Sequence, residues 1–269
     1  SYGEPAMLIL AKIVFFAVFS GAVFTSFTSI MFTGQDNFGA QNTLNQLDEL
    51  TASMDQAKLP HGSEENFQNF DIEFRHVDFK YDDTFVLKNF NLTLHQNKTY
   101  ALIGSSGGGK STIAKLISGF YPVDGGEILI GGKNIQSYSE KALIQNIAFV
   151  FQHSQLLKTS IYENVRIGNS QATRQQIMDA LDAANCTSIL DKFSQREMTV
   201  IGAKGVYLSG GEVQRIAIAR AILKNANIII MDEASAAADP ENEYELQQAF
   251  QKLMRGKTAV SYTHLRAHE

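Results

Sequence analysis

The sequence predicts an α/β fold with a largely parallel central sheet, preceded by one transmembrane helix. Short apolar runs alternate with helical stretches from about residue 70 onward, which is the pattern of parallel strands joined by helices. A glycine-rich segment links one of these strands to a helix. Nearer the N-terminus, residues 6–32 form a long apolar run that is typical of a membrane span.

Composition excludes several classes of protein. The 269 residues include one cysteine, so the chain has no disulfide scaffold. It carries 23 basic and 28 acidic side chains, and the net charge of −5 gives no electrostatic reason to bind nucleic acid. We therefore expect no nucleic-acid partner.

The apolar run at residues 6–32 contains a single charged residue, Lys12, near one end. As a helix it would extend ~40 Å, whereas a hydrocarbon core is ~30 Å thick. A signal peptide would be shorter and would follow a basic segment, and a buried core helix of this length would be unusual. We expect a transmembrane helix.

A polar segment, residues 41–58, carries leucines at helical spacing and predicts a helix that continues out of the membrane. Pro60 and Gly62 then break it. We expect one domain at residues 1–60, holding the membrane helix and its extension, and a second at residues 61–269.

The second domain is expected to begin with strands and to continue with alternating helices and strands. The predicted strands lie at residues 71–79, 90–94, 99–103, 146–151 and 227–232. The last of these is the run Asn-Ile-Ile-Ile-Met-Asp, which is typical of a strand buried on both faces.

A phosphate-binding loop is predicted between the strand at 99–103 and the helix that follows it. The pattern is G-x-x-x-x-G-K-[ST], and its glycines allow consecutive backbone N–H groups to surround phosphate oxygens at a helix start. Lys110 is suited to the β- and γ-phosphates, and the Ser111 hydroxyl to Mg²⁺. The nucleotide-binding candidates are Gly104, Ser105, Ser106, Gly107, Gly108, Gly109, Lys110, Ser111 and Thr112.

Two carboxylates end the strand at 227–232. Asp232 is placed to hold Mg²⁺ through water, and Glu233 to act as the general base that polarises the attacking water. Because the interval between Lys110 and Asp232 is longer than a minimal fold of this kind requires, we expect an inserted subdomain between them.

Residues 208–212 read Leu-Ser-Gly-Gly-Glu, and the helical run VQRIAIARAIL follows them. This resembles the signature motif of ATP-binding cassette (ABC) ATPases, which usually ends in Gln. The resemblance implies that Leu208, Ser209, Gly210, Gly211 and Glu212 contact the ATP held by the phosphate loop of a partner subunit. It also implies a fold with a RecA-like parallel core, an antiparallel β subdomain and an α-helical subdomain, and it implies ATP and Mg²⁺ as ligands.

Other positions are similar to the family pattern. Tyr81 matches the aromatic residue that stacks on adenine, and Gln152 matches the glutamine that reaches Mg²⁺ and couples the site to the membrane domain. Asp239 matches the aspartate that communicates across the dimer, although Ala236–Ala238 replace the usual Ser-Ala-Leu before it.

The resemblance covers residues 70–258 and extends to the exporter type, because residues 156–169 match the segment typical of those cassettes. It implies a half-transporter of the bacterial cytoplasmic membrane, with the cassette on the cytoplasmic side and a second half-transporter as its partner. On this interpretation the chain is a C-terminal fragment that keeps the last transmembrane helix. The exported substrate cannot be predicted, because other helices determine it. The alternatives are a regulatory, nucleotide-binding half of a heterodimeric exporter and a soluble ABC-type ATPase.

His264 falls at the register of the family's switch histidine, a catalytic residue, but His-Leu-Arg replaces the usual His-Arg-Leu. The residues from Val260 to Glu269 also resemble the translation of a sequencing adaptor. We hypothesise that the native sequence ends near Ala259 and that the match of His264 is accidental. DNA sequence beyond codon 258, compared with an independent assembly, tests this hypothesis.

Overall fold

The computed structural model describes residues 61–269 apart from 106, 120, 152–153, 203–205, 233–239 and 265–269. These residues belong to one compact unit, Leu59–Glu269. The predicted membrane helix and its polar extension lie outside the described residues. Within the described part, no helix is long and apolar enough to cross a membrane. The domain division at residue 60 stays a prediction.

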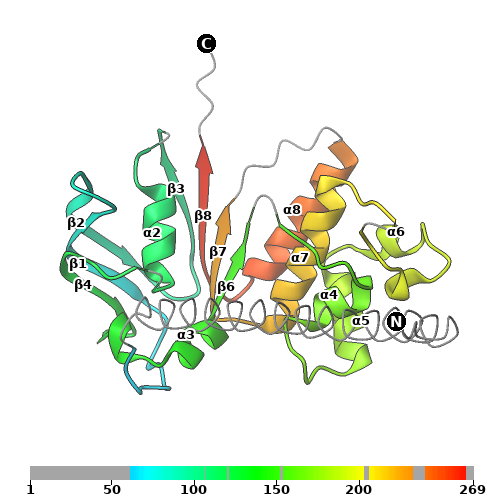
Figure 1. Cartoon of the computed structure of the whole chain (residues 1–269), viewed down its shortest axis with the longest axis horizontal. Helices are drawn as coiled ribbons and strands as arrows, with labels where there is room; N and C mark the ends of the chain where they lie inside the picture. The colour runs from blue at the N-terminus through cyan, green and yellow to red at the C-terminus, as the bar shows by residue number, and fades with distance from the viewer. Residues whose placement is uncertain are drawn as a thin grey trace, which may run out of the picture. The chain divides into compact units, whose positions relative to one another are not determined.

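A four-stranded antiparallel sheet forms one side of this unit (Figure 1). Its strand order is β2-β1-β4-β5, with bounds β1 Ile72–Lys80, β2 Phe85–Leu94, β4 Gly125–Ile130 and β5 Lys133–Asn134. The strand expected at 71–79 is confirmed as β1. The strand expected at 90–94 is only the second half of β2, and neither β4 nor β5 was predicted.

Strand β4 is not predicted from the sequence because it begins with two glycines, and glycine normally weakens a strand. Gly126 has a φ of 72°, and a Cβ at this position would lie 2.3 Å from the carbonyl oxygens of Arg75 and His76. The pairing of β1 with β4 shifts register between Arg75 and Asp78, so the two backbones approach closely there. Glycine is required at this point to keep β4 in the sheet.

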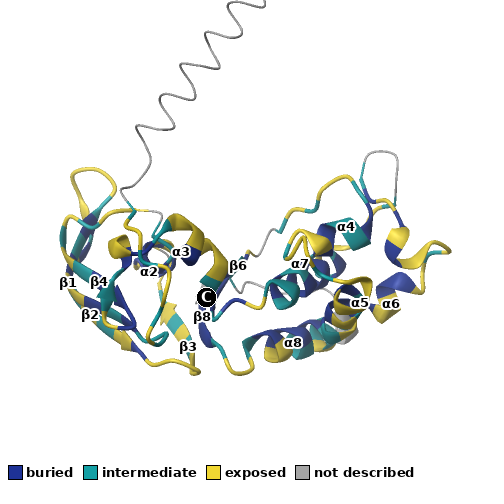
Figure 2. Ribbon diagram, turned by 90° about the horizontal axis from the view of Figure 1, so that it is seen from below, coloured by how far each residue is buried: buried dark blue, intermediate teal, exposed yellow. Residues whose placement is uncertain are grey.

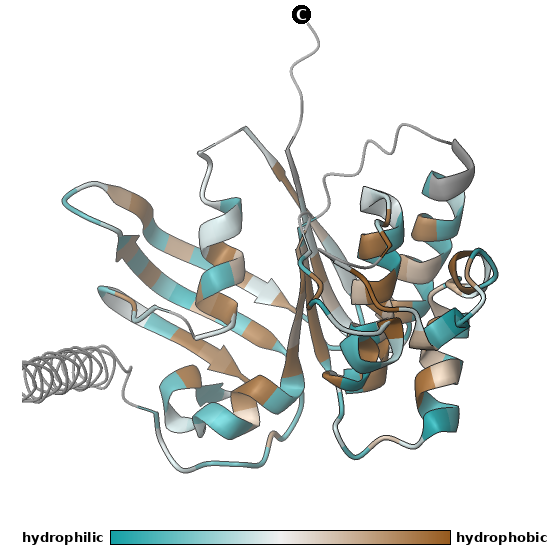
Figure 3. Ribbon diagram, turned by 45° about the vertical axis from the view of Figure 1, so that its right-hand side comes forward, coloured by the Kyte–Doolittle hydropathy of each residue, from teal (hydrophilic) through white to brown (hydrophobic). Residues whose placement is uncertain are grey.

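The second sheet is parallel, as the sequence predicts, and lies in the middle of the unit (Figure 1). Its order is β3-β8-β7-β6, with bounds β3 Thr99–Gly104, β8 Thr258–His264, β7 Ile228–Asp232 and β6 Ile147–Val150. Figure 3 shows hydrophobic residues concentrated on these central strands. Parallel strands are usually covered on both faces, which explains the unbroken apolar run of β7.

Two buried clusters cover the two faces of this parallel sheet, and β7 contributes to both in alternation. Ile228 and Ile230 pack with α2 (Lys110–Ile117) and the antiparallel sheet, whereas Ile229 and Met231 pack with α7 (Gly210–Lys224) and its neighbouring helices. Figure 2 shows the buried residues gathered where these layers meet. Helices α2 and α7 therefore lie on opposite faces of the sheet.

In the interval between Lys110 and Asp232, where an inserted subdomain is expected, the regular elements after β5 are mainly helices. Their bounds are α3 Glu140–Asn146, α4 Ile161–Arg166, α5 Arg174–Ala183, α6 Thr187–Leu190 and α7 Gly210–Lys224, with 3₁₀ turns at Ile135–Ser137 and Arg196–Met198. Hydroxyl side chains cap several of the starts, among them Ser160 at α4 and Thr173 at α5. Helix α8, Pro240–Met254, packs on α7 after β7.

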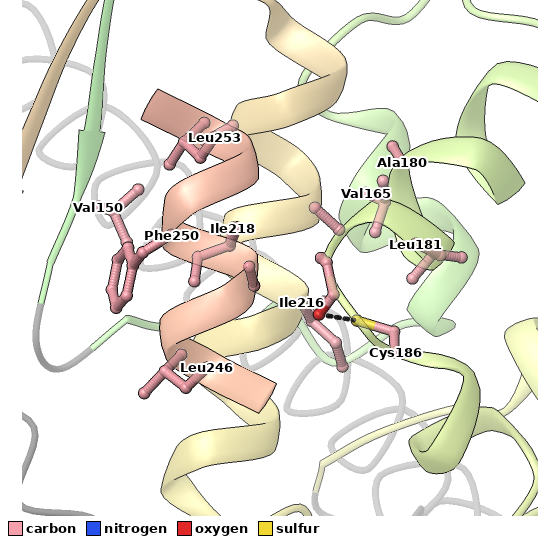
Figure 4. Close-up of a cluster of buried hydrophobic side chains, with 14 of the residues drawn as sticks. Val150, Val165, Ala180, Leu181, Cys186, Ile216, Ile218, Leu246, Phe250 and Leu253 are labelled. Atoms are coloured by element: carbon pink, nitrogen blue, oxygen red, sulfur yellow. Dashed lines mark hydrogen bonds between the residues drawn. The ribbon is translucent and has the colours of Figure 1, made fainter. Parts of the chain in front are cut away.

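The core of the helical part joins α7, α8 and β6. Figure 4 shows Phe250 and Leu253 of α8 beside Ile218 of α7 and Val150 of β6. Cys186 is buried in the same cluster, where its thiol donates to the carbonyl oxygen of Ala184 at 3.7 Å. Burial raises the pKa of the Cys186 thiol to about 12, so this cysteine is a neutral core residue at physiological pH.

Candidate nucleotide-binding site

The predicted phosphate loop connects the carboxyl end of β3 to the start of α2. Gly109 occupies the N-cap of α2 with a φ of 81°, in the left-handed region. A Cβ on Gly109 would lie 3.1 Å from a methyl group of Leu87, so both the backbone conformation and the space favour glycine. The sequence therefore folds locally as predicted, with the free N–H groups of the helix start facing the loop.

Lys110 is 6% exposed and lies over the loop. Its Nζ donates to the carbonyl oxygen of Gly104 at 2.8 Å and to that of Ser105 at 2.6 Å. The ammonium group is thus held beside the N–H groups of the helix start. A bound phosphate would find both a positive charge and several backbone donors within the same small volume.

The loop borders a hollow of about 320 Å³. It is lined by Tyr81, Val86, Gly107, Gly108, Gly109, Lys110, Ser111, Thr112 and Lys115. A larger hollow of about 960 Å³ lies elsewhere, between β6 and α7, and Phe151 and Ser154 in its wall flank the undescribed Gln152. The glycine loop and Lys110 line the smaller hollow, which makes it the candidate site for phosphate.

Tyr81 follows β1 directly and presents its ring beside this hollow. Tyr81 is 46% exposed, and its ring meets that of Tyr121 edge to face, with centroids 5.5 Å apart. Its hydroxyl lies 3.3 Å from Thr112 Oγ1, and Lys115 Nζ lies 5.7 Å from the ring centroid. An exposed aromatic ring beside a phosphate loop can stack on a nucleobase. Tyr121 and Lys115 were not predicted from the sequence.

Asp232 ends β7 at the sheet edge that also holds the phosphate loop. In the parallel ladders Gly104 lies opposite His264, and Asp232 lies opposite Tyr262, two residues earlier in β8. Burial, together with the Asp232 carboxylate, which accepts a hydrogen bond from the phenol, raises the pKa of Tyr262 to about 12.

The donor set at this edge fits Mg²⁺. Asp232 Oδ1 is buried and has no hydrogen-bond partner among the described residues, which is an unfavourable arrangement for an isolated carboxylate oxygen. A hydrated cation would satisfy it, because carboxylate and hydroxyl oxygens are preferred ligands of Mg²⁺. Ser111, in the first turn of α2, supplies a hydroxyl on the same side of the sheet.

The predicted signature motif forms the start of α7. Ser209 is the N-cap, and its Oγ accepts a hydrogen bond from the Glu212 N–H, while the Glu212 carboxylate accepts one from the Ser209 N–H at 2.7 Å. Ser209 and Gly210 are exposed, whereas Glu212 is buried. Lys192, which the sequence did not single out, donates to Glu212 Oε1 at 2.6 Å. The capping box uses the N–H groups of Ser209 and Glu212, so those of Gly210 and Gly211 remain at the start of α7 as a second candidate anion site.

The phosphate loop and the signature motif stand at the starts of two different helices, α2 and α7. Helix α2 packs in the cluster on one side of the parallel sheet, and α7 packs in the cluster on the other. Five predicted site positions lie outside the described residues or lack a described side chain: Ser106, Gln152, Glu233, Asp239 and His264. The backbone of His264 does form the end of β8.

Comparison with known proteins supports this assignment of the loop. Residues 87–236 match the family described as "ABC transporter". The chain is 46% identical over 197 residues to "ABC transporter B family member 4" of Dictyostelium discoideum, a match that covers 72% of this chain and 26% of that protein.

Two bacterial proteins are also similar. The "ATP-dependent lipid A-core flippase" of Syntrophus aciditrophicus is 40% identical over 229 residues, covering 84% of this chain and 37% of the flippase. The "Putative multidrug export ATP-binding/permease protein YgaD" of Bacillus subtilis is 40% identical over 195 residues, covering 72% and 34%. The chain thus spans about a third of the length of these two relatives.

Proposed function

The chain belongs to the ABC transporter family, and from this premise we propose that it hydrolyses ATP to drive export across a bacterial cytoplasmic membrane. The observation that carries the proposal is the pair of anion-binding helix starts, the phosphate loop at α2 and the signature motif at α7. An ATPase of this type needs both. The names of the bacterial relatives, a flippase and a multidrug export protein, support export rather than import.

Each site residue has a separate proposed role in ATP hydrolysis. The loop N–H groups and Lys110 bind and orient the β- and γ-phosphates, and Tyr81 stacks on the base. When bound, Mg²⁺ neutralises developing phosphate charge. Ser111 and Asp232 would hold it, with Gln152 as a further ligand. Glu233 accepts a proton from the attacking water as general base. If the native sequence extends through His264, this residue is proposed to contact the γ-phosphate.

The arrangement of the two helix starts supports a head-to-tail dimer. Each chain holds its phosphate loop and its signature motif at the starts of two different helices, α2 and α7, which pack in separate buried clusters. A two-fold axis places the signature motif of one chain against the phosphate loop of the other, so that each ATP is enclosed by both. Asp239, beyond Asp232 in the chain, is proposed to communicate across this contact. The partner is a second half-transporter, identical or different.

We propose that residues 6–32 form the last transmembrane helix and that the cassette lies on the cytoplasmic side. The hollow between β6 and α7 supports contact with a membrane domain, because exposed apolar side chains surround it: Ile144, Phe151 and Ile167. No substrate is assigned.

Phosphate release from ATP and Mg²⁺ by the purified chain tests the proposed function. We expect saturable ATP binding and steady turnover. Tight ATP binding without turnover would instead support the regulatory half of a heterodimer. Absence of ATP binding at millimolar concentration would overturn the proposal.

Replacing Tyr81 by alanine is expected to weaken ATP binding by about 5- to 100-fold, because base stacking on an aromatic ring is lost. Titration with a fluorescent ATP analogue, displaced by ATP, measures the change. The matched control is Tyr244→Ala on α8, which removes a ring that is 65% exposed and away from the loop. Equal affinity of the Tyr81 variant and the control would contradict the assignment.

A further inference from the structure

The signature motif of this chain contains a carboxylate inside an anion-binding site. Glu212 is 6% exposed and is the third residue of α7. One of its oxygens accepts a hydrogen bond from the Ser209 N–H at 2.7 Å, and the Ser209 hydroxyl accepts one from the Glu212 N–H. The same helix start that would bind phosphate therefore already binds a carboxylate of its own chain.

The second oxygen of Glu212 is bound by a lysine from another part of the chain. Lys192 lies just after α6, and its Nζ donates to Glu212 Oε1 at 2.6 Å. The Lys192 side chain is 57% exposed, so its charge lies at the surface beside the open start of α7. Burial favours a raised pKa for Glu212, but the hydrogen bonds from Lys192 and Ser209 outweigh it, and its pKa is lowered. Glu212 is therefore ionised at neutral pH.

A carboxylate at position 212 without a counter-charge would repel the phosphate that the motif is proposed to bind. Ser209 and Gly210 are exposed at the helix start, and an arriving γ-phosphate would approach within a few residues of Glu212. Two like unit charges about 10 Å apart, at an effective dielectric constant of about 20, repel strongly enough to change an equilibrium constant about tenfold or more. With Lys192 bound, the two side chains carry no net charge.

We propose that Lys192 and Glu212 act as one positioning pair, whose net charge sets how tightly the signature motif holds the γ-phosphate of ATP bound to the partner subunit. This inference rests on the proposed function, because it requires a phosphate at the start of α7. Lys192 balances the charge of Glu212, so the motif can work with Glu in place of Gln. Lys192 and Glu212 come from two separate segments of the chain. The strength with which the motif holds the γ-phosphate depends on the charges of both.

Four chains test the pair: the wild type, Lys192→Met, Glu212→Gln and the double variant. The steady-state KM for ATP should follow the net charge of the two positions. Lys192→Met leaves one negative charge and should raise KM about tenfold or more, whereas Glu212→Gln leaves one positive charge and should lower it. The double variant, again neutral, should return KM close to the wild-type value. Lys192→Arg, which keeps the charge, should also retain it.

If the ion pair between Lys192 and Glu212 only stabilised the fold, the variants would change the free energy of unfolding, and the KM for ATP would not follow their net charge. Urea unfolding of each variant measures stability separately, and Lys141→Met, which removes a lysine beside the exposed Glu65, is the matched control. A KM defect of Lys192→Met that persists in the double variant would overturn the charge-pair proposal. So would an unchanged KM in all four chains while turnover is present. Absence of turnover and of ATP-dependent association in every chain would instead overturn the proposed function, and the inference with it.

Discussion

Replacing Glu233 by glutamine is expected to lower the rate of ATP hydrolysis by about 100- to 10,000-fold, the range that a general base contributes. Glutamine has nearly the same shape but cannot accept the proton of the attacking water. Glu233 immediately follows Asp232, whose strand ends at the same edge as the phosphate loop. Because the loop, and not Glu233, is proposed to bind the phosphates, ATP affinity should remain. Phosphate release and nucleotide titration measure the two quantities independently.

Glu127→Gln is the matched control for this variant. Glu127 lies in β4, and its side chain is 43% exposed and faces Arg75. The substitution Glu127→Gln removes one negative charge, as Glu233→Gln does, and should leave turnover at the wild-type level. If Glu233→Gln also hydrolysed ATP at the wild-type rate, Glu233 would not be the base.

Replacing Lys110 by alanine is expected to weaken ATP binding at least about 100-fold and to abolish turnover. Hydrogen bonds to a charged group contribute about 1.5–3 kcal/mol each, and Lys110 is placed to make two of them to phosphate. In the structure its ammonium group is already held over the loop by the carbonyl oxygens of Gly104 and Ser105. Calorimetric titration with ATP and Mg²⁺ measures the loss.

The control must separate loss of the charge from loss of the fold. Lys98→Ala removes an exposed lysine just before β3 and should leave ATP binding intact. Lys110→Met keeps the apolar part of the buried side chain, so it should fold like the wild type while binding ATP as weakly as Lys110→Ala. Unchanged ATP affinity in Lys110→Met would show that the loop does not bind the phosphates.

The parts of the fold that follow from local pattern were predicted, and those that depend on tertiary pairing were not. The Ile-Ile-Ile-Met run of β7 and the strand before the glycine loop are readable because each is continuous and apolar. Strand β4 was not predicted, because Gly125 and Gly126 oppose a strand by propensity, and Gly126 is required by the close contact with β1. The start of β2 was missed because its side chains are largely exposed.

The candidate site divides in the same way. The phosphate loop and the signature motif are contiguous in sequence, so their residue types alone predict a helix start with free N–H groups. Lys192 and Tyr121 could not be found, because each reaches its site only through packing between distant segments. Nothing in the local sequence distinguishes Lys192 from other surface lysines. Its contact with Glu212 becomes visible only once α6 and α7 are placed together.

The central claim, that each ATP is enclosed by the phosphate loop of one chain and the signature motif of another, is tested most directly by mixing two inactive variants. Lys110→Ala removes the loop charge. Gly210→Asp places a carboxylate at the start of α7, where an added Cβ meets no atom within 4 Å, so the fold should tolerate it. Each variant alone should lack turnover. Their mixture should regain ATP hydrolysis, because a mixed dimer has one site with both parts intact. A mixture as inactive as either variant alone would contradict the claim.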